Sequence, residues 1–255
     1  MKIYIASSKK HKGKVSEDIY MLDAYISLGY QSEILTLTDI LNLAQPSDIV
    51  LLKSIWGYYV DHCEFIRQIE ALRIKNITLI NDYDFIVWNI DKYKYLNEIR
   101  SLGIVPTLYL QLKAAQTLSQ IEDVVVETCK KFDVHSLVIK PCISESGNLT
   151  FKYEKGGNNT AIISSLKDNK HIGFIAQPFR SSISDGELSV IVINGMPLYG
   201  IKRFPGILYQ KLDQTYVELN NIPGIVLKKV DTLKTFFYCQ DELARQGPMC
   251  AFAVR

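Results

Sequence analysis

Short apolar runs alternate with stretches of helical periodicity along the first 80 residues. The runs predict strands, because they are brief and rich in β-branched residues. They are Lys2–Ala6, Gln31–Leu37, Asp48–Leu52 and Ile77–Ile80. Between them, apolar residues recur at helical spacing over 16–28 and 59–72, with Ser16 as the expected N-cap of the first helix. Strand, helix and strand joined by short loops indicate parallel βαβ units, so residues 1–84 are predicted to form an α/β layer.

The rest of the chain mixes helical stretches with strands of alternating pattern. Helices are expected over Phe85–Arg100, Ala114–Phe132 and Thr160–Leu166. Strands are expected over Thr107–Leu112, Ser136–Lys140, Leu149–Tyr153, Gly173–Phe179, Gly186–Ile193, Met196–Arg203 and Ala251–Val254. Asn194-Gly195 predicts a tight hairpin turn between two of them. The predicted fold class is therefore α/β followed by α+β.

The stretch Ser136–Lys140 carries the most informative chemistry. Leu137, Val138 and Ile139 read as a buried strand, which Lys140 and Pro141 then end. A cation at the end of a buried strand requires a partner, because burial of an isolated charge is costly. Lys140 is therefore a candidate contact for an anionic ligand.

A loop of small polar residues, Ser144-Glu145-Ser146-Gly147, follows this strand before the next one. Such a loop lets backbone N–H groups approach phosphate oxygens, and a lysine supplies a point charge. Together they suit a phosphorylated ligand. The alternative is an ordinary hairpin preceded by a lysine whose amine reaches solvent.

In open α/β layers, ligands bind at the carboxyl ends of the strands. Here those ends carry residues 7–10, 53–58 and 81–84, and no Gly-x-Gly-x-x-Gly dinucleotide fingerprint follows the first strand. Lys53 and Trp56 are candidates for holding an anionic, partly apolar small molecule. The alternative is that Trp56 packs and Lys53 is solvated.

Composition excludes several classes of function. A formal net charge of +2 argues against nucleic-acid and membrane-surface partners. No apolar run approaches the roughly 18 residues of a membrane span, and the basic stretch follows the first apolar run, the reverse of a signal peptide. The five cysteines are scattered without a zinc or disulfide pattern, so reduced thiols and a cytoplasmic location are expected, with Cys142 as a packing residue.

Several motifs occur in an order that resembles the ATP-grasp superfamily of carboxylate–amine ligases, in particular its glutathione-synthetase-like branch. The motifs are Trp88-Asn-Ile-Asp-Lys92, Gly103-Ile-Val-Pro-Thr107, Val138-Ile-Lys-Pro141, Ser144–Gly147, Ala176-Gln-Pro-Phe179, Asp185-Gly-Glu-Leu-Ser189 and Gly200-Ile-Lys-Arg203. The Lys53-Ser-Ile-Trp56 segment and the Trp88-Asn89 pair look like bacterial ligases of the cycloserine-forming type. The resemblance covers the chain from about Lys53 onward.

The resemblance implies an ATP-grasp fold in three parts: an N-terminal parallel α/β domain over 1–84, a central lid over 85–180, and a C-terminal α+β domain over 181–255. ATP would lie between the last two parts. The implied nucleotide-binding residues are Lys92, Lys140, Ser144, Ser146, Gly147, Gln177, Pro178, Phe179 and Glu187. Lys202 and Arg203 would face the transferred phosphoryl group, and Lys53, Trp56 and Arg255 would contact substrate.

The implied reaction is ATP-dependent joining of a carboxylate to an amine through an acyl phosphate, with cations neutralising the charge that develops on the phosphoryl oxygens. The family also uses Mg²⁺, held by acidic residues that follow a pattern like Ala-Arg-Val-Asp. Residues 251–255 look like the approach to that strand, so both acidic positions are expected to be missing and the last part is expected to be truncated.

Three functions remain open at this point. The chain is an ATP-dependent ligase, a nucleotide-binding protein of the same fold that does not ligate, or a scaffold for protein contacts. ATP and a small-molecule or peptide carboxylate are the expected partners. A homodimer is the assembly that the resemblance favours.

Overall fold

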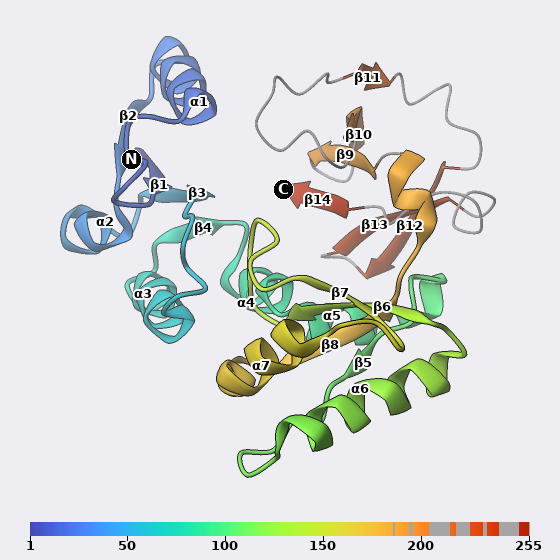
Figure 1. Cartoon of the computed structure of the whole chain (residues 1–255). Coiled ribbons are helices and arrows are strands. Elements are labelled where there is room, and N and C mark those ends of the chain that lie inside the picture. Colours follow the sequence, from blue (N-terminus) through green and yellow to red (C-terminus); the bar gives the residue numbers. More distant parts are fainter. Residues whose placement is uncertain are drawn as a thin grey trace. The chain divides into compact units, whose positions relative to one another are not determined.

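The computed structural model describes residues 1–185, 187–193, 196–203, 215–217, 225–231, 234–239 and 250–254, with side chains described to residue 184. The chain divides into two compact units (Figure 1). The first contains 1–90 together with 143–146. The second contains 91–142 and 147–255.

The first unit is built on a four-stranded parallel sheet. Its strands stand in the order β2-β1-β3-β4, with β1 paired to both β2 and β3. The elements are β1 (Lys2–Ser7), α1 (Ser16–Ser27), β2 (Gln31–Leu35), α2 (Leu37–Leu43), β3 (Ile49–Ser54), α3 (His62–Ile74), β4 (Thr78–Ile80) and α4 (Tyr83–Ile90). The parallel α/β layer predicted from the alternation of strands and helices is confirmed.

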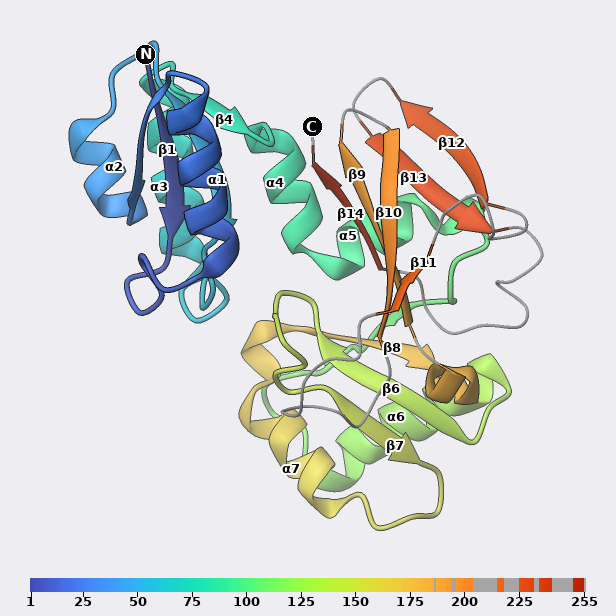
Figure 2. The same ribbon diagram turned by 90° about the horizontal axis from the view of Figure 1, so that it is seen from above.

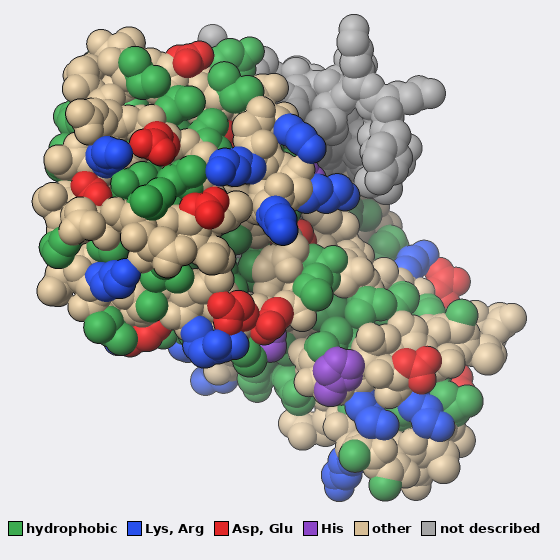
Figure 3. All heavy atoms as spheres, turned by 90° about the vertical axis from the view of Figure 1, so that its left-hand side faces the viewer, with side chains coloured by type: hydrophobic (Ala, Val, Ile, Leu, Met, Phe, Trp, Pro, Cys, Tyr) green, Lys and Arg blue, Asp and Glu red, His purple; other side chains and the backbone are tan. Residues whose placement is uncertain are grey.

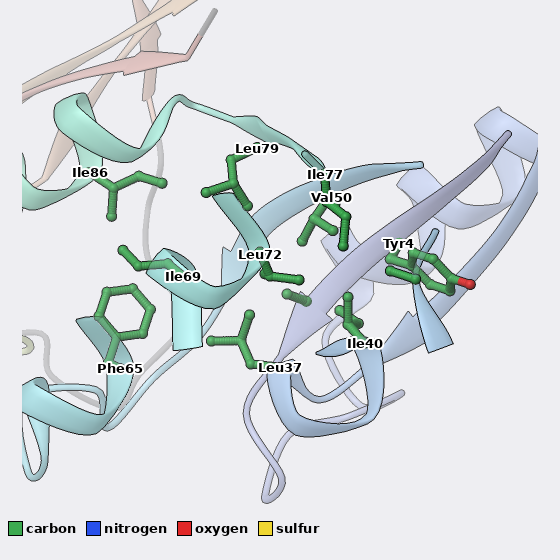
Figure 4. Close-up of a cluster of buried hydrophobic side chains, with 12 residues drawn as sticks. Tyr4, Leu37, Ile40, Val50, Phe65, Ile69, Leu72, Ile77, Leu79 and Ile86 are labelled. Carbon is green, nitrogen blue, oxygen red and sulfur yellow. The ribbon is translucent and has the colours of Figure 1, made fainter. Parts of the chain in front are cut away.

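Both faces of this sheet are covered by helices, as expected for a parallel sheet. Tyr4 and Ala6 of β1 point into a core shared with α2 and α3, whereas α1 covers the opposite face, to which the alternation along β1 directs Ile3 and Ile5 (Figure 1). Figure 4 shows Leu72 of α3 directed among the apolar side chains of α2 and β3. Burial of these side chains stabilises the unit.

Two local predictions in this unit were wrong. The second strand ends at Leu35, not Leu37, because Thr36 begins helix α2 and its hydroxyl accepts a hydrogen bond from the Asp39 N–H at 3.2 Å. Ser16 is the first helical residue of α1, and the N-cap is Val15, whose side chain makes no capping hydrogen bond. Val15 is instead buried, so packing determines where α1 starts.

A buried polar cluster ties α1 to the sheet. Ser7 and Ser54 are partners on the neighbouring strands β1 and β3, and Ser54 Oγ donates to Asp18 Oδ1 of α1 at 2.8 Å. All three residues are at least 97% buried. The hydrogen bond supplies one donor to a carboxylate that would otherwise be isolated from water.

The second unit begins where one predicted helix is broken in two. The expected helix over 85–100 is wrong: α4 ends at Ile90 and α5 (Lys92–Glu98) starts anew. Asp91 has extended backbone angles, and its carboxylate accepts hydrogen bonds from the N–H groups of Tyr93 and Lys94 at 2.9 and 3.2 Å. Asp91 is therefore a helix N-cap inside a continuous apolar pattern.

A four-stranded antiparallel sheet in the order β5-β8-β6-β7 forms the best-described part of this unit. Its elements are β5 (Leu108–Tyr109), α6 (Leu118–Phe132), β6 (Ser136–Pro141), β7 (Phe151–Glu154), α7 (Thr160–Asp168) and β8 (Phe174–Pro178), with short 3-10 helices at Arg100–Leu102, Lys170–Ile172 and Ser181–Asp185. Helices α6 and α7 cover one face of the sheet (Figure 2). Helix α6 begins four residues later than expected, because Thr117 and Gln120 form a capping box.

The remaining strands are β9 (Glu187–Ile193), β10 (Met196–Arg203), β11 (Thr215–Val217), β12 (Ile225–Asp231), β13 (Lys234–Cys239) and β14 (Cys250–Val254). Strands β9 and β10 pair antiparallel, whereas Asn194-Gly195, the predicted turn between them, lies outside the described residues. Strand β14 pairs parallel to β9, and β12 pairs with β13. Among the described residues, no helix has the length and apolar character needed to cross a membrane.

The Asp18–Ser54 hydrogen bond yields a stability prediction. Replacing Ser54 with Ala should lower the free energy of unfolding by about 1–3 kcal/mol, because it leaves a buried carboxylate without its donor. Urea unfolding followed by tryptophan fluorescence measures this, since both tryptophans lie in the first unit. Ser27→Ala, which removes an exposed hydroxyl that donates to the Ala24 carbonyl, is the matched control and should change stability by less than about 0.5 kcal/mol. Equal effects of the two substitutions would contradict a structural role for the cluster.

Candidate functional site

The sheet of the second unit has one apolar face and one mixed face. Leu137 and Ile139 of β6, with Ala176 of β8, are fully buried in the core formed with α6 and α7. Because side chains alternate along a strand, Val138 and Lys140 project from the opposite face. We call this the open face of the sheet.

Lys140 occupies the position that the sequence predicted. It is the penultimate residue of β6, followed by the buried Pro141, and it is paired with Ile175 of β8. Lys140 is itself half-buried. Burial of the alternate residues Leu137 and Ile139 therefore directs its charged side chain to the open face.

Gln177 and Phe179 extend the open face along β8 and just beyond it. Gln177 is 9% exposed, is paired with Val138, and donates from Nε2 to Thr107 Oγ1 at 2.8 Å. Pro178 is on the apolar face opposite Leu137, and the Phe179 N–H then donates to the Ser136 carbonyl at 3.0 Å. Lys140, Gln177 and Phe179 are thus brought to one surface by strand pairing.

Lys152 is a member of this surface that the sequence prediction missed. It lies on β7 opposite Val138, with its ammonium nitrogen 4.3 Å from the centroid of the Phe179 ring and 2.6 Å from Glu154 Oε1. A cation over an aromatic face is attracted by the ring quadrupole. The alternation Phe151-Lys-Tyr-Glu154 was the available signal, because it places Lys152 on the face opposite the buried Tyr153.

Lys92 is brought to the end of β6 by a backbone contact. Its N–H donates to the Cys142 carbonyl at 2.8 Å, two residues beyond Lys140. Helix α5 therefore starts next to the carboxyl end of the central strand. The two lysines assigned to phosphate contacts lie on segments that this hydrogen bond joins.

Cys142 is a packing residue in this region. Burial raises the pKa of its thiol to about 12, and the charge of Asp91 acts in the same direction. Its N–H donates to the Gly173 carbonyl at 3.1 Å, and a side chain at Gly173 would meet the Tyr109 hydroxyl at 2.9 Å. A thiol with so high a pKa carries almost no thiolate at neutral pH, so a nucleophilic role is not supported.

The loop after β6 has the backbone geometry of a tight turn. Ser146 and Gly147 both have positive φ, at 50° and 71°, and Ser144 is buried. Residues 143–146 group with the first unit, where the Gly57 N–H donates to Glu145 Oε1 at 2.6 Å. The pKa of Tyr58 is raised to about 12, mainly because the hydroxyl is buried and to a smaller extent because Glu145 is negatively charged.

Lys53 and Trp56 lie at the carboxyl edge of the parallel sheet in the first unit. Lys53 is exposed near the end of β3, and Trp56 is 47% exposed. The Trp56 ring meets the ring of His11, from the loop after β1, edge-on with centroids 4.8 Å apart. The two loops that follow β1 and β3 are therefore in contact, as expected for a ligand edge of such a sheet.

The remaining predicted residues fall where the structure describes only the backbone or nothing. Glu187 and Arg203 are partners at one end of the β9–β10 hairpin, with Lys202 adjacent to Arg203. Pairing of β9 with β10 thus brings the backbone positions of Glu187, Lys202 and Arg203 together. Arg255 lies outside the described residues.

The polar groups of the open face fit a nucleotide better than a metal. Lys140 and, through the Cys142 contact, Lys92 can neutralise phosphate charge, whereas Gln177 and the Phe179 ring can contact a base. Within the part of the chain that the structure describes, no three His, Cys, Asp or Glu side chains are grouped to hold a metal ion. The described residues therefore do not provide the Mg²⁺ ligands that the ATP-grasp resemblance implies.

Part of the chain matches a known protein family. Residues 105–209 match the sequence profile of the ATP-grasp domain of prokaryotic glutathione synthetase. No curated protein sequence matches the chain.

Several solved structures are similar in fold. D-cycloserine synthetase superposes with a TM-score of 0.61 at 17% identity, covering 79% of this chain and 68% of that one. An ATP-grasp protein with a RimK domain from Sphaerobacter thermophilus gives a TM-score of 0.56 at 10% identity, covering 80% and 73%. N5-carboxyaminoimidazole synthase from Aspergillus clavatus, in complex with ADP and 5-aminoimidazole ribonucleotide, gives 0.58 at 10% identity, covering 82% and 54%.

Identities this low establish the fold and leave the substrates undetermined. The matched segment 105–209 contains β5 to β8, which carry the open face, and the β9–β10 hairpin. The profile match shows ATP-grasp sequence over residues 105–209, and the similarity to the fold of ATP-grasp proteins extends over about four-fifths of the chain.

Proposed function

We propose that this chain binds ATP on the open face and uses it to join a carboxylate to an amine. The observation that carries the proposal is the convergence of Lys140, Gln177 and Phe179 on one sheet face, with the start of α5 hydrogen-bonded to the end of the same strand. The fold neighbours support it, because one is named a synthetase and another is a complex with ADP.

The base would lie against the apolar part of the open face. Val138, which is only partly buried, offers aliphatic surface there, and Gln177 and the backbone on either side of Pro178 offer hydrogen-bonding groups. Lys152 stands over Phe179 at the same end, 4.3 Å from the ring centroid. Glu187, the first residue of β9, would help to hold the nucleotide by analogy with the acidic residue at this point in ATP-grasp proteins.

The phosphates would lie toward the other end of β6. Lys140 and Lys92 supply positive charge there. Lysine charges act on phosphoryl oxygens electrostatically, and this is the main task of a protein in phosphoryl transfer. This placement separates the base from the phosphates along one strand.

The ligation would proceed in two steps. A carboxylate oxygen of the substrate attacks the γ-phosphorus of ATP, which forms an acyl phosphate and releases ADP. An amine then attacks the acyl carbon and displaces inorganic phosphate, and the amine gives up a proton. Lys202 and Arg203 would stabilise the oxygens of the transferred phosphoryl group.

The three-part division implied by the resemblance belongs to this proposal. Residues 1–84 would present substrate through Lys53 and Trp56, 85–180 would form the lid, and 181–255 would supply the catalytic cations. The acyl phosphate reacts with water, so a lid that excludes water during the second step is required. The described residues provide no group of acidic side chains that could hold Mg²⁺.

The contribution of Lys140 to nucleotide binding can be measured directly. Lys140→Met should weaken ATP binding at least tenfold, because it removes a charge-assisted contact from a half-buried site. Isothermal titration calorimetry of the full chain, with and without Mg²⁺, measures the dissociation constant. A concentration of ATP at 100 times that constant should also raise the stability of the wild type by about 2.7 kcal/mol.

Lys131→Met in α6 is the matched control, because it removes an equally long cation from an exposed site away from the open face. It should leave ATP affinity unchanged within about twofold. Similar affinities for the Lys140 and Lys131 variants would contradict the proposed phosphate site.

A substitution at Lys202 distinguishes ligation from nucleotide binding alone. Lys202→Met should lower the turnover number about 100-fold or more while changing ATP affinity by less than about threefold, because a transition-state contact adds little to ground-state binding. The assay follows ADP and phosphate release with panels of amino acids and short peptides as carboxylate and amine. Tight ATP binding without phosphate release in any mixture would instead indicate a nucleotide-binding protein that does not ligate.

A further inference from the structure

Five lysines gather at the carboxyl edge of the parallel sheet in the first unit. Four follow β1 within a few residues, and the fifth stands near the end of β3. They are Lys9, Lys10, Lys12, Lys14 and Lys53. Figure 3 shows Lys and Arg side chains (blue) on the face that it presents, several of them near one another. We call these residues, with His11 and Trp56, the lysine-rich edge.

Short hydrogen bonds and one ring contact hold the lysine-rich edge together. The Ser8 N–H donates to the Ser54 carbonyl at 2.7 Å, which joins the loop after β1 to the end of β3. Ser8 Oγ is 2.8 Å from His11 Nδ1, and the His11 ring meets Trp56 edge-on. These contacts order the loop that carries the lysines and keep Trp56 at its border.

Most of this positive charge is not neutralised within the described structure. Lys12 pairs with Asp39 at 3.5 Å, and both side chains are at least 40% exposed. Among the described residues, the other four lysines form no ion pair. Two acidic groups of the same unit are engaged elsewhere: Glu145 accepts from the Gly57 N–H, and Asp18 accepts from Ser54 and is buried.

The charge is also concentrated relative to the whole chain. The formal net charge of the protein is only +2, so five cations in two neighbouring loops form a local excess. Such an excess attracts a ligand of opposite sign and raises its rate of association. Trp56, with 47% of its surface exposed beside this charge, adds an apolar contact that a purely electrostatic surface lacks.

We propose that the lysine-rich edge binds an acidic polypeptide segment, with Trp56 as its apolar anchor. The exposed lysines are spread over two loops, so one small anion meets only some of them, whereas an extended chain presents carboxylates in series. Arginine is the residue preferred for nucleic-acid phosphates, and the first 66 residues contain none. A segment that alternates Glu or Asp with Leu or Phe matches both the charge and the exposed indole.

This proposal shares Lys53 and Trp56 with the substrate contacts proposed above, but it does not depend on ligation, because it involves neither the open face nor ATP. Its test is titration of the full chain with a Glu-rich peptide containing interspersed leucines, in the absence of nucleotide. Calorimetry gives the affinity. Acrylamide quenching gives the location, because Trp56 is exposed and Trp88, the second tryptophan, is only 4% exposed.

We expect the peptide to bind and to shield Trp56 from acrylamide. The triple variant Lys9→Gln, Lys10→Gln, Lys14→Gln should weaken binding about tenfold, since each exposed pair contributes modestly. Rising salt should weaken wild-type binding as well.

Trp56→Leu should weaken binding severalfold by calorimetry while leaving the salt dependence in place, because the lysines remain.

The control is the triple variant Lys113→Gln, Lys131→Gln, Lys155→Gln, which removes the same charge from exposed positions in the second unit. An equal loss of affinity in this control would overturn the proposal, because the attraction would then follow net charge alone. So would equal binding of the peptide with Gln in place of Glu, or no shielding of Trp56. Competition by free glutamate at the peptide's own concentration would indicate a small-molecule site instead, and tighter binding of single-stranded DNA would indicate a nucleic-acid site.

Discussion

Burial of one face of the antiparallel sheet in the second unit is the constraint on which the candidate site depends. Leu137 and Ile139 are fully buried against α6 and α7, and this fixes the register of β6 with respect to its core. A shift by one residue would exchange the two faces, so the position of Lys140 follows from the packing of its neighbours. The apolar core and the charged face are two consequences of one alternation. Pairing with β8 then adds Gln177 to the same face.

The sequence was sufficient for the general architecture. The parallel layer, the central strand with its lysine and the two paired strands β9 and β10 all followed from periodicity. The resemblance to the ATP-grasp superfamily rested on seven short motifs in order, and the profile match to residues 105–209 agrees with it. Patterns that repeat over many residues were therefore reliable, because each position reinforces the others.

Boundaries set by single side chains were less predictable. Asp91 ends one helical pattern and begins another, and Thr36 converts the end of a strand into a helix, each through hydrogen bonds from its side chain. Neither break interrupts the apolar periodicity, so periodicity alone could not show it. Lys152 was missed for a different reason. Strand β6 pairs with β7 on one side and with β8 on the other, and this brings Lys152 and Phe179, which are 27 residues apart in the sequence, to the same face (179 − 152 = 27). No local motif encodes that contact.

Both units place cations beside an aromatic side chain, although by different means. In the second unit, sheet pairing sets Lys152 over Phe179 on the open face. In the first, two loops at the carboxyl edge of the sheet bring His11 to Trp56 among exposed lysines. The first arrangement suits the flat base and phosphates of a nucleotide, and the second suits an extended acidic chain. Each can be tested without the other.

Photoaffinity labelling with 8-azido-ATP tests the central claim most directly, because it reports where the base is bound. Irradiation of the full chain, digestion and mass spectrometry would locate the modified residues. The account predicts labelling of β6, β7 and the segment 175–179, suppressed by excess ATP. Labelling confined to residues 1–90, or labelling that excess ATP does not suppress, would contradict a nucleotide site on the open face.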